Sequence, residues 1–188
     1  MSERWAFEWI NKDAEVGPLF RIGRDVYERD RAGQRVIRLK AVETYPAEVA
    51  DTAVTAFAEM ARLWKAPVLF IIDPNLKKPP AVRFLFEWSR KTHAMGAVDC
   101  AIMKTGNLVS QVMGKVVLRV FTDGALPFEA IKGEAAVQKR LSELDLTCNR
   151  VGFRLVEPST ALVRGEDAPP SLLGSIFRRA ARRISGRR

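Results

Sequence analysis

The side chains best suited to moving protons in this sequence are two aspartates. Asp73 follows an apolar run at residues 68–72, and Asp99 lies in a second apolar segment, residues 97–103. Ligands of open α/β sheets bind at the carboxyl ends of parallel strands, so two carboxylates there could act as acid and base or hold a metal ion. Alternatively, Asp73 caps a turn before Pro74 and Asp99 faces solvent. The pattern favours this second interpretation.

Nucleophilic chemistry would fall to Cys100 with the lone histidine, His93. A thiol needs a neighbouring base, and no other imidazole is present. His93 falls on the same side of a predicted helix as Leu85 and Phe86, which favours a packed or capping histidine over a catalytic dyad. Cys148 has no evident partner, and two cysteines are too few for a disulfide scaffold or a four-cysteine zinc site.

The glycines form no phosphate-binding motif, because neither G-x-G-x-x-G nor G-x-x-x-x-G-K-[ST] occurs. Residues 104–107, Lys-Thr-Gly-Asn, lie at a predicted strand-to-helix junction and could present amides to an anion, a geometry common to α/β loops. We therefore expect no catalytic residue, no cofactor and no bound metal, and we predict that the protein is not an enzyme.

Positive charge is concentrated at the end of the chain. The net charge is +9, from 31 basic and 22 acidic residues. Residues 171–188 hold six arginines and no acid, which leaves residues 1–170 with 25 basic and 22 acidic residues, a net charge of +3. A basic chain suggests nucleic-acid binding, but here that interpretation depends on the tail alone.

Residues 171–188 have the pattern of a basic amphipathic helix. Such a helix can lie among lipid headgroups, with its arginines against anionic lipid. It could instead dock on its own domain or in a partner's groove, or act as a nucleic-acid arm. Its phenylalanine, isoleucine and leucine content favours the membrane over nucleic acid. The apolar side is Leu172, Leu173, Ile176, Phe177 and Ile184, and the basic side is Arg178, Arg179, Arg182 and Arg183.

Short strands and helices alternate along the rest of the chain. Residues 4–10 suit a strand or a short helix, and residues 19–29 and 34–43 predict two strands around a turn. The order predicts an α/β fold, a small mixed sheet flanked by helices, with right-handed crossovers. The later elements are a helix from Pro46 to residue 65, a strand at 68–72, a helix at 80–95, a strand at 97–103, a helix at 107–121, a strand at 127–131, a helix at 133–144 with Ala136, Val137, Leu141 and Leu144 inward, and an edge strand at 151–156.

The chain divides into four parts by composition. These are an N-terminal aromatic segment at residues 1–14, the α/β domain at 15–157, a linker rich in Pro and acids at 158–170, and the tail at 171–188. No apolar run approaches the ~18 residues of a membrane-spanning helix, and the first residues lack the apolar core of a secretory signal. We expect a cytoplasmic protein, peripheral at the inner membrane face through its tail.

The predicted helix at 80–95 is apolar over about 200° of its circumference, more than the ~100° stripe that suffices for a surface helix. Phe84, Trp88 and Met95 cluster on one flank of it. They could be covered by the N-terminal segment of Trp5 and Trp9, or by a second protomer or a partner protein. These three residues are the candidate interface.

The segments 20–41, 67–75, 98–117 and 127–141 together resemble the SpoIIAA-like, or STAS/SEC14-like, bacterial domain over roughly residues 19–144. The resemblance implies a small mixed sheet with flanking helices, and a regulatory or interaction module or a binder of apolar ligands. Phosphorylatable relatives carry Asp-Ser-Ser-Gly or a similar motif after the central strand. Here residues 74–88 contain no serine or threonine, so the resemblance implies no phosphorylation switch.

The sequence thus predicts a non-catalytic regulatory or scaffold module that recognises a protein partner or itself. One alternative is a carrier of a lipid or other apolar ligand held between sheet and helices, which requires a cavity of several hundred cubic ångströms. A second is a nucleic-acid-binding accessory protein that acts through the arginine-rich tail.

Overall fold

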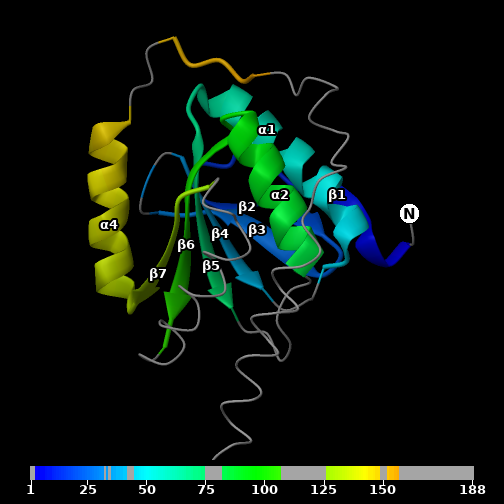
Figure 1. Cartoon of the computed structure of the whole chain (residues 1–188), viewed down its shortest axis with the longest axis horizontal. Helices are drawn as coiled ribbons and strands as arrows, with labels where there is room; N and C mark the ends of the chain where they lie inside the picture. Colours follow the sequence, from blue (N-terminus) through cyan, green and yellow to red (C-terminus); the bar gives the residue numbers. More distant parts are fainter. Residues whose placement is uncertain are drawn as a thin grey trace, which may run out of the picture. The chain divides into compact units, whose positions relative to one another are not determined.

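Seven strands form one mixed sheet, and their order in space is their order in the sequence (Figure 1). The computed structural model describes residues 3–31, 33, 35–41, 45–74, 82–106, 126–148 and 152–156. Within these ranges the chain is an α/β protein with three α-helices. The chain divides into one unit of residues 1–157 and a second of residues 158–188, which lies outside the described residues. No helix among the described residues is long and apolar enough to cross a membrane.

The first four strands form an antiparallel meander. The predicted strand at 19–29 is wrong as a single element, because it consists of two strands. Ile22 pairs with Asp25, so only Gly23 and Arg24 lie between them, and Gly23 has a positive φ of 59° that suits a tight hairpin turn. The N-terminal segment contains both of its predicted alternatives. The elements are a 3₁₀ turn η1 (Glu3–Trp5), β1 (Phe7–Trp9), β2 (Gly17–Ile22), β3 (Asp25–Arg29) and β4 (Val36–Ala41).

Parallel strands continue the sheet from β4 onward. The predicted helices and strands between residues 46 and 105 and between 127 and 147 are confirmed to within a few residues. The predicted helix at 107–121 lies outside the described residues. The elements are a 3₁₀ turn η2 (Ala47–Val49), α1 (Ala50–Trp64), β5 (Val68–Pro74), α2 (Val82–Ala94), β6 (Val98–Thr105), β7 (Phe128–Lys132) and α4 (Glu134–Thr147).

Two predictions near the end of the domain are wrong. Residues 152–156 form no strand, and the Val156 amide instead donates a hydrogen bond to the Met95 carbonyl at 3.1 Å. Ala136 is exposed, while Val137 and Leu141 are buried and Leu144 is half-buried. Four residues are slightly more than one helical turn, so Val137, Leu141 and Leu144 fall on one side, and the helix turns Ala136 away from the sheet.

Helices cover both faces of the sheet. α1 and α2 lie on one face and α4 on the other (Figure 1). The larger core lies under α1 and α2, where Phe57 of α1, Phe70 of β5 and Trp88 of α2 have their ring centroids 4.8–5.5 Å apart. The smaller core, under α4, consists of Val36, Leu69, Ile71, Cys100, Ile102, Val137 and Leu141. β5 contributes to both cores, which explains its unbroken apolar run.

Arg35 is a buried charge that connects the sheet to α4. Its side chain is 1% exposed, and it precedes β4. The guanidinium donates to the Asp145 and Asp99 carboxylates at 3.0 and 3.1 Å. It also donates to the Pro67 and Leu144 carbonyls at 2.7 and 2.8 Å. A buried guanidinium is stable only when its donors are satisfied, and here four acceptors from three parts of the chain meet that need.

Replacing Arg35 should destabilise the whole domain. We expect Arg35→Met to lower the free energy of unfolding by about 2–4 kcal/mol, because two carbonyls and two carboxylates lose their shared donor. Urea unfolding followed by circular dichroism measures this change. The matched control is Arg21→Met, whose guanidinium is exposed and pairs with Glu8 at 2.5 Å; it should change stability by no more than about 0.5 kcal/mol. Equal losses in the two variants would contradict a central role for Arg35.

Candidate functional site

Charged side chains gather on the α4 face at the carboxyl ends of the parallel strands. Alternation along the strands brings Arg38 of β4, Asp73 of β5 and Lys104 of β6 to this face, beside Glu134 at the start of α4. Lys104 contacts the Asp73 carboxylate at 2.6 Å and that of Glu134 at 3.2 Å. Arg38 donates to both Glu134 oxygens, at 2.6 and 3.2 Å, and also pairs with Asp30.

The ion pairs in this cluster fix the protonation state of its members. A hydrogen bond to Asp73 raises the pKa of Lys104 above its usual value, so the amine stays protonated and is no nucleophile at neutral pH. Hydrogen bonds from Arg38, and then from Gln138, lower the pKa of Glu134 to about 2. A carboxyl group with that pKa cannot carry protons near pH 7. The cluster therefore holds α4 on the sheet and is poorly suited to proton transfer.

The two predicted acid–base candidates lie at opposite ends of the sheet. The start of β6, where Asp99 lies, is beside the start of β5, whereas Asp73 is near the end of β5. Asp99 pairs with Arg35, and Asp73 pairs with Lys104. They cannot act as one acid–base pair. Among the described residues, no group of three or more His, Cys, Asp or Glu side chains could hold a metal ion.

The sheet also separates the predicted thiol–imidazole pair. Cys100 lies in the core under α4, while His93 is exposed on α2, which covers the opposite face. Burial raises the pKa of the Cys100 thiol to about 12, so the thiolate is scarce at neutral pH. Cys148 is a free, half-buried cysteine. In the predicted anion loop, the Thr105 hydroxyl donates to the Ile131 carbonyl at 3.2 Å, and Asn107 lies outside the described residues.

The predicted interface at Phe84, Trp88 and Met95 belongs to the core of the chain. All three are buried, at 7%, 3% and 7% exposure. Trp88 packs on α1 and β5, and the ring of Phe84 lies 5.1 Å from that of Tyr45. The wide apolar arc of this helix therefore reflects contact with both α1 and the sheet. The tail residues from Leu172 to Ile184 lie outside the described residues.

Three buried side chains, joined by hydrogen bonds that the sequence did not predict, connect the meander to the turn before α1. Asp25 is fully buried and accepts a hydrogen bond from the Tyr45 hydroxyl at 2.6 Å, and Tyr27 donates to Tyr45 at 3.3 Å. Burial raises the pKa of both tyrosines, so both hydroxyls remain protonated, and Tyr45 is the one that donates to the carboxylate. No local pattern distinguishes this aspartate from the many acids at turns.

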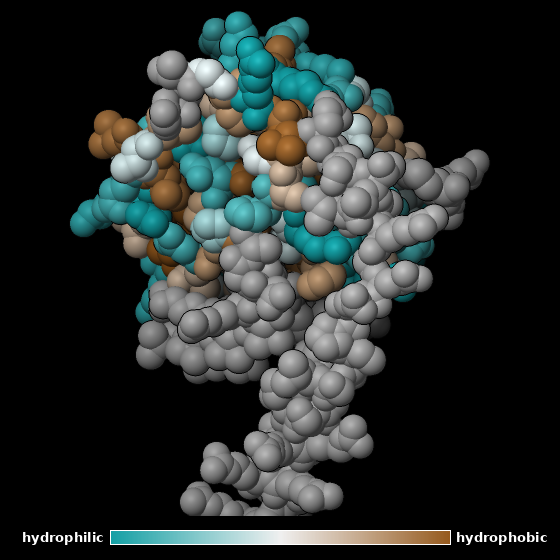
Figure 2. Space-filling model, turned by 45° about the horizontal axis from the view of Figure 1, so that its top comes forward, coloured by the Kyte–Doolittle hydropathy of each residue, from teal (hydrophilic) through white to brown (hydrophobic). Residues whose placement is uncertain are grey.

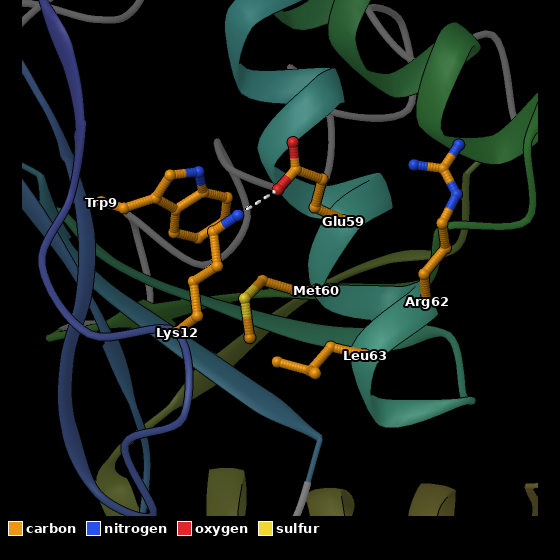
Figure 3. Close-up of a pocket in the computed structure, with 6 residues that line it drawn as sticks. All are labelled: Trp9, Lys12, Glu59, Met60, Arg62 and Leu63. Atoms are coloured by element: carbon orange, nitrogen blue, oxygen red, sulfur yellow. Dashed lines mark hydrogen bonds and ion pairs between the residues drawn. The ribbon is translucent and has the colours of Figure 1, made fainter.

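An open groove of about 370 Å³ lies between the N-terminal segment and α1 (Figure 3). Trp9 of β1 forms one wall, and Leu63 of α1 provides exposed apolar surface opposite. Lys12 crosses between them, with its amine 4.3 Å from the Trp9 ring centroid and 2.8 Å from the Glu59 carboxylate. Met60 also lines the groove, but its side chain is buried in the core. Arg62 of α1 also lines the groove. No spacing in the sequence indicates that these residues come together.

The segment that borders this groove is held in place at several points. The amides of Ile10 and Asn11 both donate to the Leu19 carbonyl, at 2.9 and 3.1 Å. Arg29 donates to the Ala14 carbonyl at 3.0 Å and lies 5.1 Å from the ring centroid of Trp64. Because both walls are fixed by the fold, the groove is preformed, as ligand sites in proteins usually are.

The exposed surface around the groove mixes apolar and charged residues. Leu63 is 48% exposed, and Ile10 and Val16 of the bordering segment are about as exposed. On the face shown in Figure 2, hydrophobic and hydrophilic residues are interspersed. Leu63 thus offers exposed apolar surface close to the Lys12–Glu59 ion pair. Comparison of the chain with protein-family models, curated proteins and solved structures gives no match.

The stability provided by Glu134 should depend on pH with a defined sign. Its pKa is lower in the folded chain than the ordinary 4.5, so its stabilising effect is complete above about pH 4.5 and disappears as the pH falls towards about 2. We expect Glu134→Gln to cost less than about 1 kcal/mol near pH 6, since the side chain is half-exposed and screened, and almost nothing near pH 2.5.

Urea unfolding across this pH range tests the prediction. Lys139→Gln on the same helix is the control, because it replaces an exposed charged side chain and leaves every carboxylate in place. A difference between wild type and Glu134→Gln that stays constant from pH 6 to pH 2.5 would contradict the assignment.

Proposed function

We propose that this chain is a non-catalytic regulatory or scaffold module that binds a protein partner or a second copy of itself. The observation that carries the proposal is the preformed groove formed by Trp9, Lys12, Met60 and Leu63. It offers an apolar surface beside a Lys12–Glu59 ion pair, which suits a peptide with an apolar side chain and polar backbone. The charges at the carboxyl edge of the sheet, by contrast, already pair with one another.

The likeness to SpoIIAA-like, or STAS-like, domains belongs to this proposal. The order of elements and the mixed sheet with helices on both faces support it. A carrier of apolar ligands is the alternative. The groove is less suited to that role than to macromolecular contact, because it opens to solvent and an ion pair crosses it. Carriers generally bury most of the ligand's surface.

We further propose that residues 171–188 form a basic amphipathic helix that binds an anionic membrane surface, which would place a cytoplasmic protein at the inner face of the membrane. Six arginines without an acid, four of them on the side opposite the apolar residues, support this proposal. A nucleic-acid arm is the alternative, and the aliphatic and aromatic content of the tail favours lipid.

The affinity of peptides that are selected for binding to the chain should depend on the groove. We expect peptides enriched from a random display library on the full chain to lose at least about tenfold in affinity on Leu63→Glu, because the charge disrupts an apolar contact. The control is Leu146→Glu, the same change on α4 at a residue that is 88% exposed; it should leave affinity within about twofold. Fluorescence anisotropy gives both affinities. Peptides that bind Leu63→Glu as tightly as wild type would contradict the proposed site.

The tail should carry the membrane affinity. The full chain should float with phosphatidylcholine vesicles that contain phosphatidylserine, and salt should weaken binding, because the Debye length is only about 8 Å at physiological ionic strength. Ile176→Asp with Phe177→Asp should abolish flotation, because the apolar side supplies about 25 cal/mol per Å² buried. Ser175→Asp with Ser185→Asp adds the same charge on the arginine side of the wheel and should retain partial binding.

Two results would contradict this assignment. Equal flotation of both double variants would mean that the contact is electrostatic alone. No flotation, together with binding of the full chain to DNA or RNA at physiological salt, would identify the tail as a nucleic-acid arm.

A further inference from the structure

The helix α4 is attached to the sheet by few apolar contacts. Only Val137 and Leu141 of its side chains are buried, whereas α1 buries eight residues, including Phe57 and Met60. Eight of the fourteen residues of α4 are exposed. Because apolar burial is the main favourable term in packing, α4 holds its face of the sheet much more weakly than α1 holds the other.

Ion pairs provide much of the remaining attachment. Glu134 binds Arg38 and Lys104 at the first turn, Arg140 binds Glu129 of β7 at 2.6 Å, and Arg35 binds the last turn. The carboxylates in these pairs are each about a third to a half exposed, and water replaces their partners readily. Release of α4 also returns Arg35 to solvent, which offsets part of the lost attraction.

A single glycine links α4 to the sheet on its N-terminal side. Gly133 caps the helix with φ 82° and ψ 154°, without a side-chain hydrogen bond. This region of backbone conformation is open mainly to glycine, and a glycine absorbs large changes of dihedral angle at low cost. The helix can therefore turn about this residue while β7, immediately before it, stays in the sheet.

We propose that α4 is a releasable cover, which opens from the sheet while the rest of the domain stays folded. Opening uncovers an apolar strip on β4, β5 and β6 that includes Leu69, Ile71, Cys100 and Ile102. Arg35, Arg38 and Lys104 border this strip and lose their α4 partners together. The closed state predominates because the strip is apolar. The proposal does not depend on the proposed function, because it concerns the relative stability of two elements of the fold.

The opening of α4 can be measured by chemical modification of Cys100, because the thiol of this residue lies under the helix. The probe is the rate at which a small aromatic disulfide reagent modifies Cys100 in the full chain with Cys148→Ser, over a series of urea concentrations below the unfolding transition. We expect the rate to be nearly independent of urea at first, because a local opening exposes little surface, and to rise steeply only when global unfolding takes over.

Two matched core variants separate local opening from global unfolding. Leu141→Ala in α4 should raise the low-urea rate by roughly 30-fold or more. Val54→Ala in α1, on the other face of the sheet, should leave that rate within about twofold, although it lowers global stability. A wild-type rate with the full urea dependence of unfolding, or an equal acceleration by both variants, would overturn the proposal.

Discussion

The guanidinium of Arg35 is a charge removed from water, and its four acceptors come from parts of the chain that are distant in sequence. It contacts the residue before β5, the start of β6 and the end of α4. Each of these must be in position before the cation can be buried without a large penalty. The arrangement therefore specifies where α4 ends and how β4, β5 and β6 are aligned.

The two faces of the sheet are held by different physical forces. Under α1 and α2 an aromatic cluster of Phe20, Tyr27, Phe57, Phe70 and Trp88 supplies most of the contact. Under α4 the contact surface is small, and charges at the start, middle and end of the helix complete it. Water cannot take the place of a packed aromatic ring, whereas it readily takes the place of the partner in an exposed ion pair. This asymmetry is the basis on which we propose that α4 opens from the sheet.

The pairing of charged side chains with one another also bears on function. Asp73, Asp99, Lys104 and Glu134 hold the fold together through ion pairs, and Cys100 is buried as a neutral thiol. The groove beside Trp9 differs, because Leu63 and Trp9 remain partly exposed on walls that the fold fixes. A surface that is ordered and still open to solvent is suited to binding a partner.

The sequence by itself determined the elements whose pattern is local. The apolar run before Asp73 predicted β5, because a strand that is buried on both faces is apolar at successive positions. The helical periodicity from Val49 to Trp64 predicted α1, because a helix that is buried on one side has apolar residues every three to four positions. The tertiary structure alone decided which side chains meet. Arg35 and Asp145 are 110 residues apart, and nothing near either residue indicates the other. Cys100 and His93 are close in sequence yet lie on opposite faces of the sheet, because the chain passes from a helix on one face into a strand whose alternate side chains point to the other.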